Sequence, residues 1–213
     1  MPVTISLEQI RKLAPSVRSS YADAFGQGAV VFERHGITRS SLRVAHFMAQ
    51  VLHESGALKV QWESLYYTPK RLPKVWPKRF QPGGPLDPTA YAFNEEKLGN
   101  EVYGNRMGND QPGDGFKFRG RGLLQLTGKD SYRQATQILR HWVADAPDFV
   151  LDPDQVLGSQ WCLAVAAAEW EALGCNQFAD EDSVRKVTRA LNGGYVGLAE
   201  REDWTRKTKT IWA

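Results

Sequence analysis

The chain has 213 residues, of which 42% are hydrophobic and 24% charged, and its 27 basic and 24 acidic residues leave a formal charge of +3. This length predicts one domain with a buried core, or one domain with a smaller lobe. The mild charge and the lack of a recognised motif argue against a nucleic-acid partner. No apolar run approaches the ~20 residues of a membrane span, so we expect no membrane insertion.

The first part of the chain predicts a small helical bundle. Ser6 and Gln9 form a capping-box pattern that opens a helix over residues 7–13. Apolar residues at helical spacing predict two further helices, at 21–26 and 29–35. No apolar signal core precedes these helices, so we expect another factor to deliver the protein to any extracytoplasmic substrate.

A longer helix is predicted at 41–54, because apolar residues recur there at helical spacing and Gly56 can end it. Four polar side chains fall on the opposite face of this helix at positions i, i+4, i+7 and i+8: His46, Gln50, His53 and Glu54. We expect this polar stripe either to face water or to line a cleft.

After Glu63 the composition changes. The Pro/Gly-rich stretch at 81–88 belongs to an expected smaller lobe at about 64–118, inserted in a single catalytic domain that spans 1–213. The basic residues within 70–79 either contact an acidic polymer or form a solvated helix face. Phe and basic residues alternate at 116–119, which predicts a half-exposed strand.

The last third predicts more helices, and the fold class is therefore mainly α. Asp130 is a plausible N-cap for a helix with one apolar stripe. A helix at 159–173 is apolar on nearly all sides and should be the buried centre of the domain. Asp180 or Asp182 is expected to cap the next helix, and a final helix follows at 198–212.

The cysteines and histidines predict neither a disulfide nor a metal site. Cys162 and Cys175 flank one predicted helix, whose ends would be about 20 Å apart, too far for a disulfide bond. We therefore expect two free thiols in a reducing compartment. His46 and His53 lack the spacing of metal ligands, so no metal and no cofactor are expected.

Two carboxylates lie close together in sequence, Glu54 at a predicted helix end and Glu63 nine residues later. Such a pair is the minimum equipment for cutting a glycosidic bond by acid–base chemistry, although two solvated surface acids give the same spacing. An acid at the apolar end of a packed helix can keep its proton near neutral pH. A carboxylate in a loop stays ionised and can activate water.

Four segments in chain order resemble the family 19 glycoside hydrolases, which have the chitinase-like fold of the lysozyme superfamily. They are FMAQVLHESG (47–56), YAFNEEKLGNEVYGNRMG (91–108), GDGFKFRGRGLLQLTGKDSY (113–132) and VTRALNGGYVGLAER (187–201). The resemblance implies a helical domain whose smaller lobe forms a glycan-binding cleft. The nine-residue acid spacing looks closest to the short bacterial and phage members, among them phage endolysins.

The resemblance also implies roles for individual residues. Glu54 looks like the general acid, Glu63 like the general base, and Thr127 like the residue that holds the attacking water. The residues implied to bind substrate or support the cleft are Gln125, Ser131, Asn192, Arg201 and His53. Ser131 departs from plant chitinases, where a sugar-contacting asparagine is usual, and the disulfides of those enzymes are missing here.

We therefore expect an endolysin-type peptidoglycan hydrolase that cleaves β-1,4 glycosidic bonds, with inversion, and releases phage progeny by host lysis. It is expected to act as a monomer on glycan strands. It would wait in the host cytoplasm and reach the periplasm with the help of a separate membrane-permeabilising protein. The alternatives are a chitinase acting on β-1,4-N-acetylglucosamine polymers, a secreted cell-wall toxin, and a non-catalytic glycan-binding module, which should have lost one acid.

Overall fold

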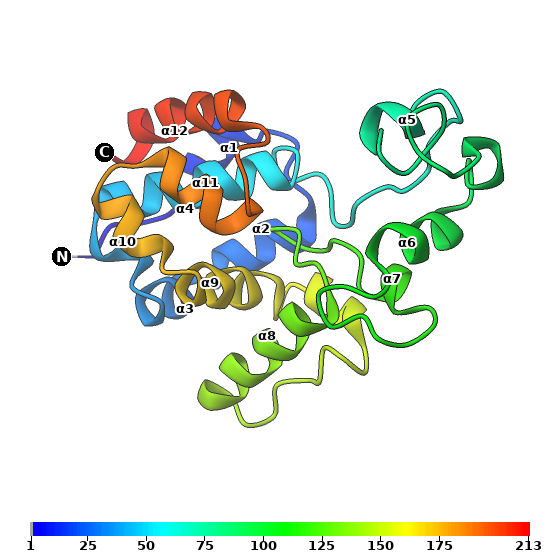
Figure 1. Ribbon diagram of the computed structural model, residues 1–213. Helices are drawn as coiled ribbons and strands as arrows, with labels where there is room; N and C mark the ends of the chain where they lie inside the picture. The colour runs from blue at the N-terminus through cyan, green and yellow to red at the C-terminus, as the bar shows by residue number, and fades with distance from the viewer. Residues whose placement is uncertain (1) are drawn as a thin grey trace.

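Helix α4 (Ser41–Glu54) lies at the centre of the body in the computed structural model, which describes residues 2–213. Ser40 begins the helix by accepting a hydrogen bond from the Arg43 amide (3.2 Å). The apolar face of the helix, including Phe47 and Met48, is fully buried. Helix α12 (Leu198–Trp212) packs along α4, so these two helices together fix the position of Glu54 (Figure 1).

The other helices surround this pair or extend to one side of it (Figure 1). They are α1 (Leu7–Leu13), α2 (Ser19–Gly26), α3 (Ala29–Arg34), α5 (Leu72–Val75), α6 (Glu95–Tyr103), α7 (Asp114–Lys117), α8 (Lys129–Trp142), α9 (Cys162–Ala172), α10 (Cys175–Asp180) and α11 (Val184–Asn192). Short 3-10 turns occur at Ile37–Arg39, Pro88–Ala90 and Pro153–Leu157. Within residues 2–213, β structure is limited to isolated bridges, at Trp62–Arg121, Phe80–Leu86 and Arg121–Leu126. The predicted mainly α fold class is confirmed.

Three separate clusters of buried apolar side chains hold the molecule together. The first joins α4 to the N-terminal helices, α9 and α12, and includes Trp170. The second lies between α8 and α9 around Tyr132 and Phe149. The third is built entirely from the stretch 65–116, around Phe80. We call residues 64–118 the small lobe; its helices α5 and α6 lie to one side of the body (Figure 1).

The capping box and the free thiols agree with the predictions. Ser6 and Gln9 form the expected capping box at the start of α1. Both Cys162 and Cys175 are buried free thiols. No helix among the described residues is at once long enough and apolar enough to cross a membrane.

The predicted strand at 116–119 is wrong, since this stretch contains the end of the short helix α7. Four residues are too few to separate a helical period from a strand period. The two aromatic residues explain the alternation differently, because Phe116 packs in the small-lobe cluster and Phe118 packs in the second cluster. The chain here passes from one core to another.

The start of helix α8 was predicted incorrectly. Gly128, not Asp130, precedes it, and Asp130 lies in its first turn with an ion pair to Arg133 (2.5 Å). The negative charge of Asp130 still suits the positive end of the helix dipole.

Further along the chain, the apolar helix begins at Cys162 rather than at 159. The cap of α11 is Ser183, whose hydroxyl accepts from the Lys186 amide (3.3 Å). Asp180 and Asp182 are used for tertiary contacts instead, with Arg43 (2.6 Å) and His46 (2.8 Å). A cap chosen from sequence alone cannot anticipate such distant partners.

Candidate active site

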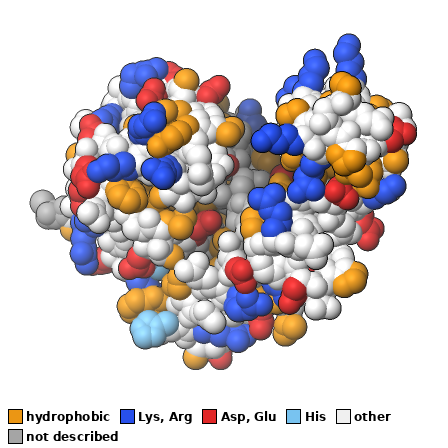
Figure 2. All heavy atoms as spheres, viewed as in Figure 1, with side chains coloured by type: hydrophobic (Ala, Val, Ile, Leu, Met, Phe, Trp, Pro, Cys, Tyr) orange, Lys and Arg blue, Asp and Glu red, His pale blue; other side chains and the backbone are white. Residues whose placement is uncertain are grey.

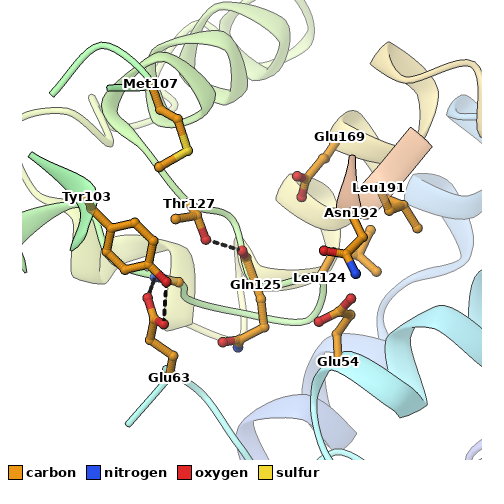
Figure 3. A pocket seen from close by; sticks show the side chains of 11 residues that line it. Glu54, Glu63, Tyr103, Met107, Leu124, Gln125, Thr127, Glu169, Leu191 and Asn192 are labelled. Atoms are coloured by element: carbon orange, nitrogen blue, oxygen red, sulfur yellow. Dashed lines mark hydrogen bonds between the residues drawn. The ribbon is translucent and has the colours of Figure 1, made fainter. Parts of the chain in front are cut away.

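A cavity of about 470 Å³ lies between the body and the small lobe, where the surface is hollowed in Figure 2. Its lining comes from α4, α6, α9, α11 and the loops that follow α4, α6 and α7 (Figure 3). The lining residues are Glu54, Glu63, Tyr103, Met107, Gly120, Leu124, Gln125, Thr127, Glu169, Leu191 and Asn192. Both predicted catalytic acids therefore line one cavity.

Glu63 is held by two hydrogen-bond donors. The backbone amide of Gly120 donates to Oε1 (2.6 Å), and the hydroxyl of Tyr103 donates to Oε2 (2.8 Å). Burial and the negative charge of Glu63 raise the pKa of Tyr103, so its phenol stays protonated and remains a donor. With both oxygens accepting, Glu63 has the surroundings of a fixed carboxylate that can receive a proton from water.

Glu54 has different surroundings. The buried guanidinium of Arg201, only 2% exposed, contacts Oε1 of Glu54 and also donates to Oε1 of Gln50 (2.5 Å). This corrects the expectation that Glu54 would sit in an apolar setting. The carboxyl group faces the cavity beside a cation that fixes its orientation.

The polar stripe on α4 was expected either to face water or to line a cleft. Over most of its length it does neither. His46 and Gln50 are fully buried against the C-terminal helices. His46 Nε2 pairs with Asp182 (2.8 Å), and burial lowers the pKa of His46. Only Glu54, at the end of the stripe, reaches the cavity. The other polar side chains attach α4 to its neighbours.

Thr127, Gln125 and Glu63 converge on Gly120. A Cβ atom at Gly120 would lie 3.1 Å from Gln125 Oε1, 3.2 Å from Thr127 Oγ1 and 3.3 Å from Glu63 Oε1. The Thr127 hydroxyl donates to the backbone oxygen of Gln125 (2.7 Å), which leaves its lone pairs free to accept. Three polar oxygens therefore surround one small space beside Glu63, and the absence of a side chain at Gly120 keeps that space open.

The remaining predicted residues are distributed around the cavity. Asn192 lines it and donates to the backbone oxygen of Val196 (3.2 Å). Arg201 lies behind Glu54, outside the lining. His53 is half-buried, close to Gly197, and burial followed by the nearby Arg201 charge lowers its pKa. Ser131 lines a separate cavity of about 50 Å³.

Sequence reasoning missed two polar side chains of the main cavity. Tyr103 was within a matching segment but received no role, because its partner Glu63 is 40 residues away. Glu169 was counted in an apolar helix and passed over. An acid on a helix that is otherwise buried was the available signal. Within residues 2–213, no cluster of His, Cys, Asp and Glu is arranged to hold a metal ion.

The helical fold of the chain is shared by solved chitinases. Solved structures with this fold include a bacterial family 19 chitinase (18% identity, TM-score 0.66, covering 98% of this chain and 95% of the other). Chitinase C from Streptomyces griseus HUT6037 is similar at 15% identity and TM-score 0.66, covering 98% and 92%. A class IV chitinase from Zea mays gives 16% identity and TM-score 0.54, covering 98% and 86%.

Sequence comparison gives the family. The chain is 38% identical, over 164 residues and 76% of each chain, to a glycosyl hydrolase family 19 domain-containing protein from Haemophilus influenzae (strain ATCC 51907 / DSM 11121 / KW20 / Rd). No protein-family model matches the chain. At this identity and coverage, the protein belongs to glycoside hydrolase family 19. It is a glycoside hydrolase, as the resemblance implied.

Proposed function

We propose that the protein is an endolysin-type peptidoglycan hydrolase that cleaves β-1,4 glycosidic bonds of the bacterial cell-wall glycan by acid–base catalysis. The observation that carries the proposal is that Glu54 and Glu63 line one cavity from different elements, each held by its own partners. The loss of one acid, which would indicate a glycan-binding module without activity, has not occurred.

In the proposed reaction, Glu63 accepts a proton from a water molecule as that water attacks the anomeric carbon. Glu54 gives a proton to the leaving glycosidic oxygen, so the old C–O bond breaks as the new one forms. Attack from the opposite face inverts the anomeric centre and needs carboxyl groups ~6.5–9.5 Å apart. Solvent then returns a proton to Glu54 and removes one from Glu63.

Glu54 must carry a proton when the bond breaks, although Arg201 contacts it in the free protein. A glycan that fills the cavity removes water from this carboxyl, and the loss of water favours its protonated form. Thr127 and Gln125 lie beside Glu63, where they would orient the attacking water. The protein's own side chains thus supply the acid, the base and the water position.

Two features favour peptidoglycan as the substrate. The acids are nine residues apart, and both cysteines are free. Figure 2 also shows Lys and Arg side chains gathered on the small lobe beside the hollow, where they would attract an anionic polymer. Free thiols suit storage in a host cytoplasm before a separate protein opens the membrane.

A chitinase is the second candidate, because the solved structures that share the fold over 98% of this chain are chitinases. The experiment that separates the two is mass spectrometry of fragments released from purified peptidoglycan and from a soluble chitin oligomer. We expect glycan fragments from peptidoglycan and none from the Glu54→Gln control. Efficient chitin cleavage with intact peptidoglycan would show that the endolysin proposal is wrong.

A further inference from the structure

Helix α9 contains an acid that the proposed reaction does not use. The helix is buried at the centre of the body, and its two charged residues are Glu169 and Glu171. Glu171 is half-exposed and accepts a hydrogen bond from His35 Nδ1 (2.6 Å). Glu169 instead points toward the cavity that contains Glu54 and Asn192 (Figure 3). The two acids of α9 therefore have different surroundings.

Glu169 has no partner in the described part of the chain. Its Oε2 atom is buried without a hydrogen bond, and no ion pair within residues 2–213 includes it. A buried carboxylate without a partner is costly, so a structural role would normally come with a donor or a cation. The carboxyl group therefore lines the cavity without a protein partner and is available to a group that enters the cavity.

The charges near Glu169 favour a neutral carboxyl group. Glu54 on α4 contributes a negative charge, and the cation behind it, Arg201, contacts Glu54 and Gln50. On α10, Cys175 is neutral, because burial raises the pKa of its thiol to about 12. Burial, and then the charge of Glu54, raise the pKa of Glu169 to about 8.

Glu169 lines both the main cavity and the smaller cavity that contains Ser131. The side chains that α8, α11 and the 119–128 loop present to these two cavities are uncharged. They are Leu124, Gln125, Leu126, Thr127, Ser131, Gln134, Ala135, Ile138, Leu191 and Asn192. None of these side chains offers Glu169 a positive charge. Below the raised pKa, the carboxyl group is a protonated acid with one O–H donor.

We propose that Glu169 binds the substrate by donating a hydrogen bond from its carboxylic acid to an acceptor oxygen of the glycan, an acetamido carbonyl or a sugar hydroxyl. N-acetylhexosamine units offer such acceptors along the whole strand. A neutral acid also avoids repelling the carboxylates that peptidoglycan carries, which an ionised Glu169 would do. The proposal rests on the proposed function, since it takes the cavity to be the glycan site.

The protonation state can be measured without any activity. Protein labelled with ¹³C at the glutamate carboxyl carbon is titrated by NMR, and the Glu169→Gln variant identifies the signal of Glu169. We expect this signal to titrate near pH 8, well above the ordinary value of 4.5. A midpoint near the ordinary value means that Glu169 is ionised at neutral pH, and the proposal is then wrong.

Binding tests the hydrogen bond itself. The Glu63→Gln variant serves as an inactive background, because removing Glu54 would alter the titration of Glu169. Calorimetry measures its affinity for an N-acetylglucosamine tetramer at pH 6 and pH 9. Adding Glu169→Ala should weaken binding at pH 6 by about 5–10-fold, the usual effect of one lost hydrogen bond. Adding Glu169→Gln, which keeps a donor, should weaken it by less than about threefold.

The pH dependence separates donation from packing. The affinity of the background for the tetramer should fall from pH 6 to pH 9. Adding Glu169→Gln should abolish this fall. Adding the matched control Glu202→Gln, at an exposed glutamate on α12, should leave the fall unchanged. The proposal is wrong if the Glu169→Ala variant binds like the background, or if the affinity of the background does not change with pH. It is also wrong if the background does not bind the tetramer. Binding of the tetramer by the background, without hydrolysis of peptidoglycan by the natural protein, contradicts only the proposed function.

Discussion

The two acids proposed for catalysis, Glu54 and Glu63, differ in what holds them. Glu63 accepts hydrogen bonds from neutral donors, the Gly120 amide and the Tyr103 hydroxyl, whereas Glu54 contacts the cation of Arg201 and lies near a third carboxyl, Glu169. Neutral donors fix the direction of a carboxylate without changing the net charge of the site. Glu54 instead has a cation and a second carboxyl group beside it. Residues of the same type therefore have different electrostatic surroundings in one cavity.

The largest expected effect comes from removing either acid. Glu54→Gln should lower turnover on peptidoglycan by at least about 10²–10⁴-fold, since it removes the only proton donor to the leaving oxygen. Substrate binding should be kept, because glutamine has nearly the same shape. Glu63→Gln should also be severely impaired. Turnover and binding measured on the same samples decide this, and near-wild-type lysis by Glu54→Gln would overturn the assignment.

Arg201→Ala should come next, and it should affect the Glu54 side alone. The substitution leaves Glu54 and Gln50 without their donor. We expect it to lower the free energy of unfolding by about 2–3 kcal/mol. This is at or below the usual range for a buried pair, because Glu54 is partly exposed. Urea denaturation measures the loss. Arg206→Ala, which removes an exposed ion pair with Asp203 on the same helix, is the control and should change stability by less than about 0.5 kcal/mol. Equal losses in the two variants would contradict the prediction.

Glu169 should make stability depend on pH. In the unfolded chain it loses its proton near the ordinary value of 4.5, whereas the folded protein keeps the proton up to about pH 8. Between these values the folded state binds more protons, so the contribution of Glu169 to the free energy of unfolding falls as pH rises. Glu169→Gln should therefore be more stable than the natural protein at pH 8–9, by about 1–3 kcal/mol, with a smaller difference at pH 5.

Thermal unfolding of the two proteins across this pH range measures the effect. Glu202→Gln should follow the natural protein at every pH. If Glu169→Gln and the natural protein differ by a constant amount at all pH values, Glu169 titrates alike in the folded and unfolded chains.

The smallest effects should come from the groups beside Glu63. Tyr103→Phe removes one donor to the base and should lower kcat/KM by about tenfold, while Thr127→Ala should cost about 1 kcal/mol of barrier, or roughly fivefold. Steady-state kinetics on one glycan substrate gives both values. Thr127→Ala proving worse than both acid variants would require new roles for all of these residues.

The sequence was sufficient wherever the information was local. Helix α4 and its end at Glu54 follow from apolar spacing, and the capping box at Ser6 follows from four residues. The motif matches also placed Glu54, Glu63, Thr127, Gln125 and Asn192, which do line one cavity.

Long-range contacts decided the rest. Nothing local indicates that Arg201 reaches Glu54, or that Asp182 pairs with His46 instead of capping α11. The same holds for Glu169, whose significance depends on a missing partner, and a missing partner is visible only in three dimensions. Ser131 matched a motif position, yet its side chain lines a different cavity.

The junction between Phe116 and Phe118 has a mechanical consequence for the base. These two rings are anchored in different cores only two residues apart, so a rotation of the small lobe would bend the chain at this point. Tyr103 moves with the lobe, whereas Gly120 lies beyond the junction, on the side of the body. Tilting the lobe would stretch the bond from Tyr103 to Glu63 and leave the bond from Gly120 in place. The hydrogen bonds of Glu63 therefore depend on the angle between the two parts, and Glu63 keeps both donors only with the lobe in the orientation seen here.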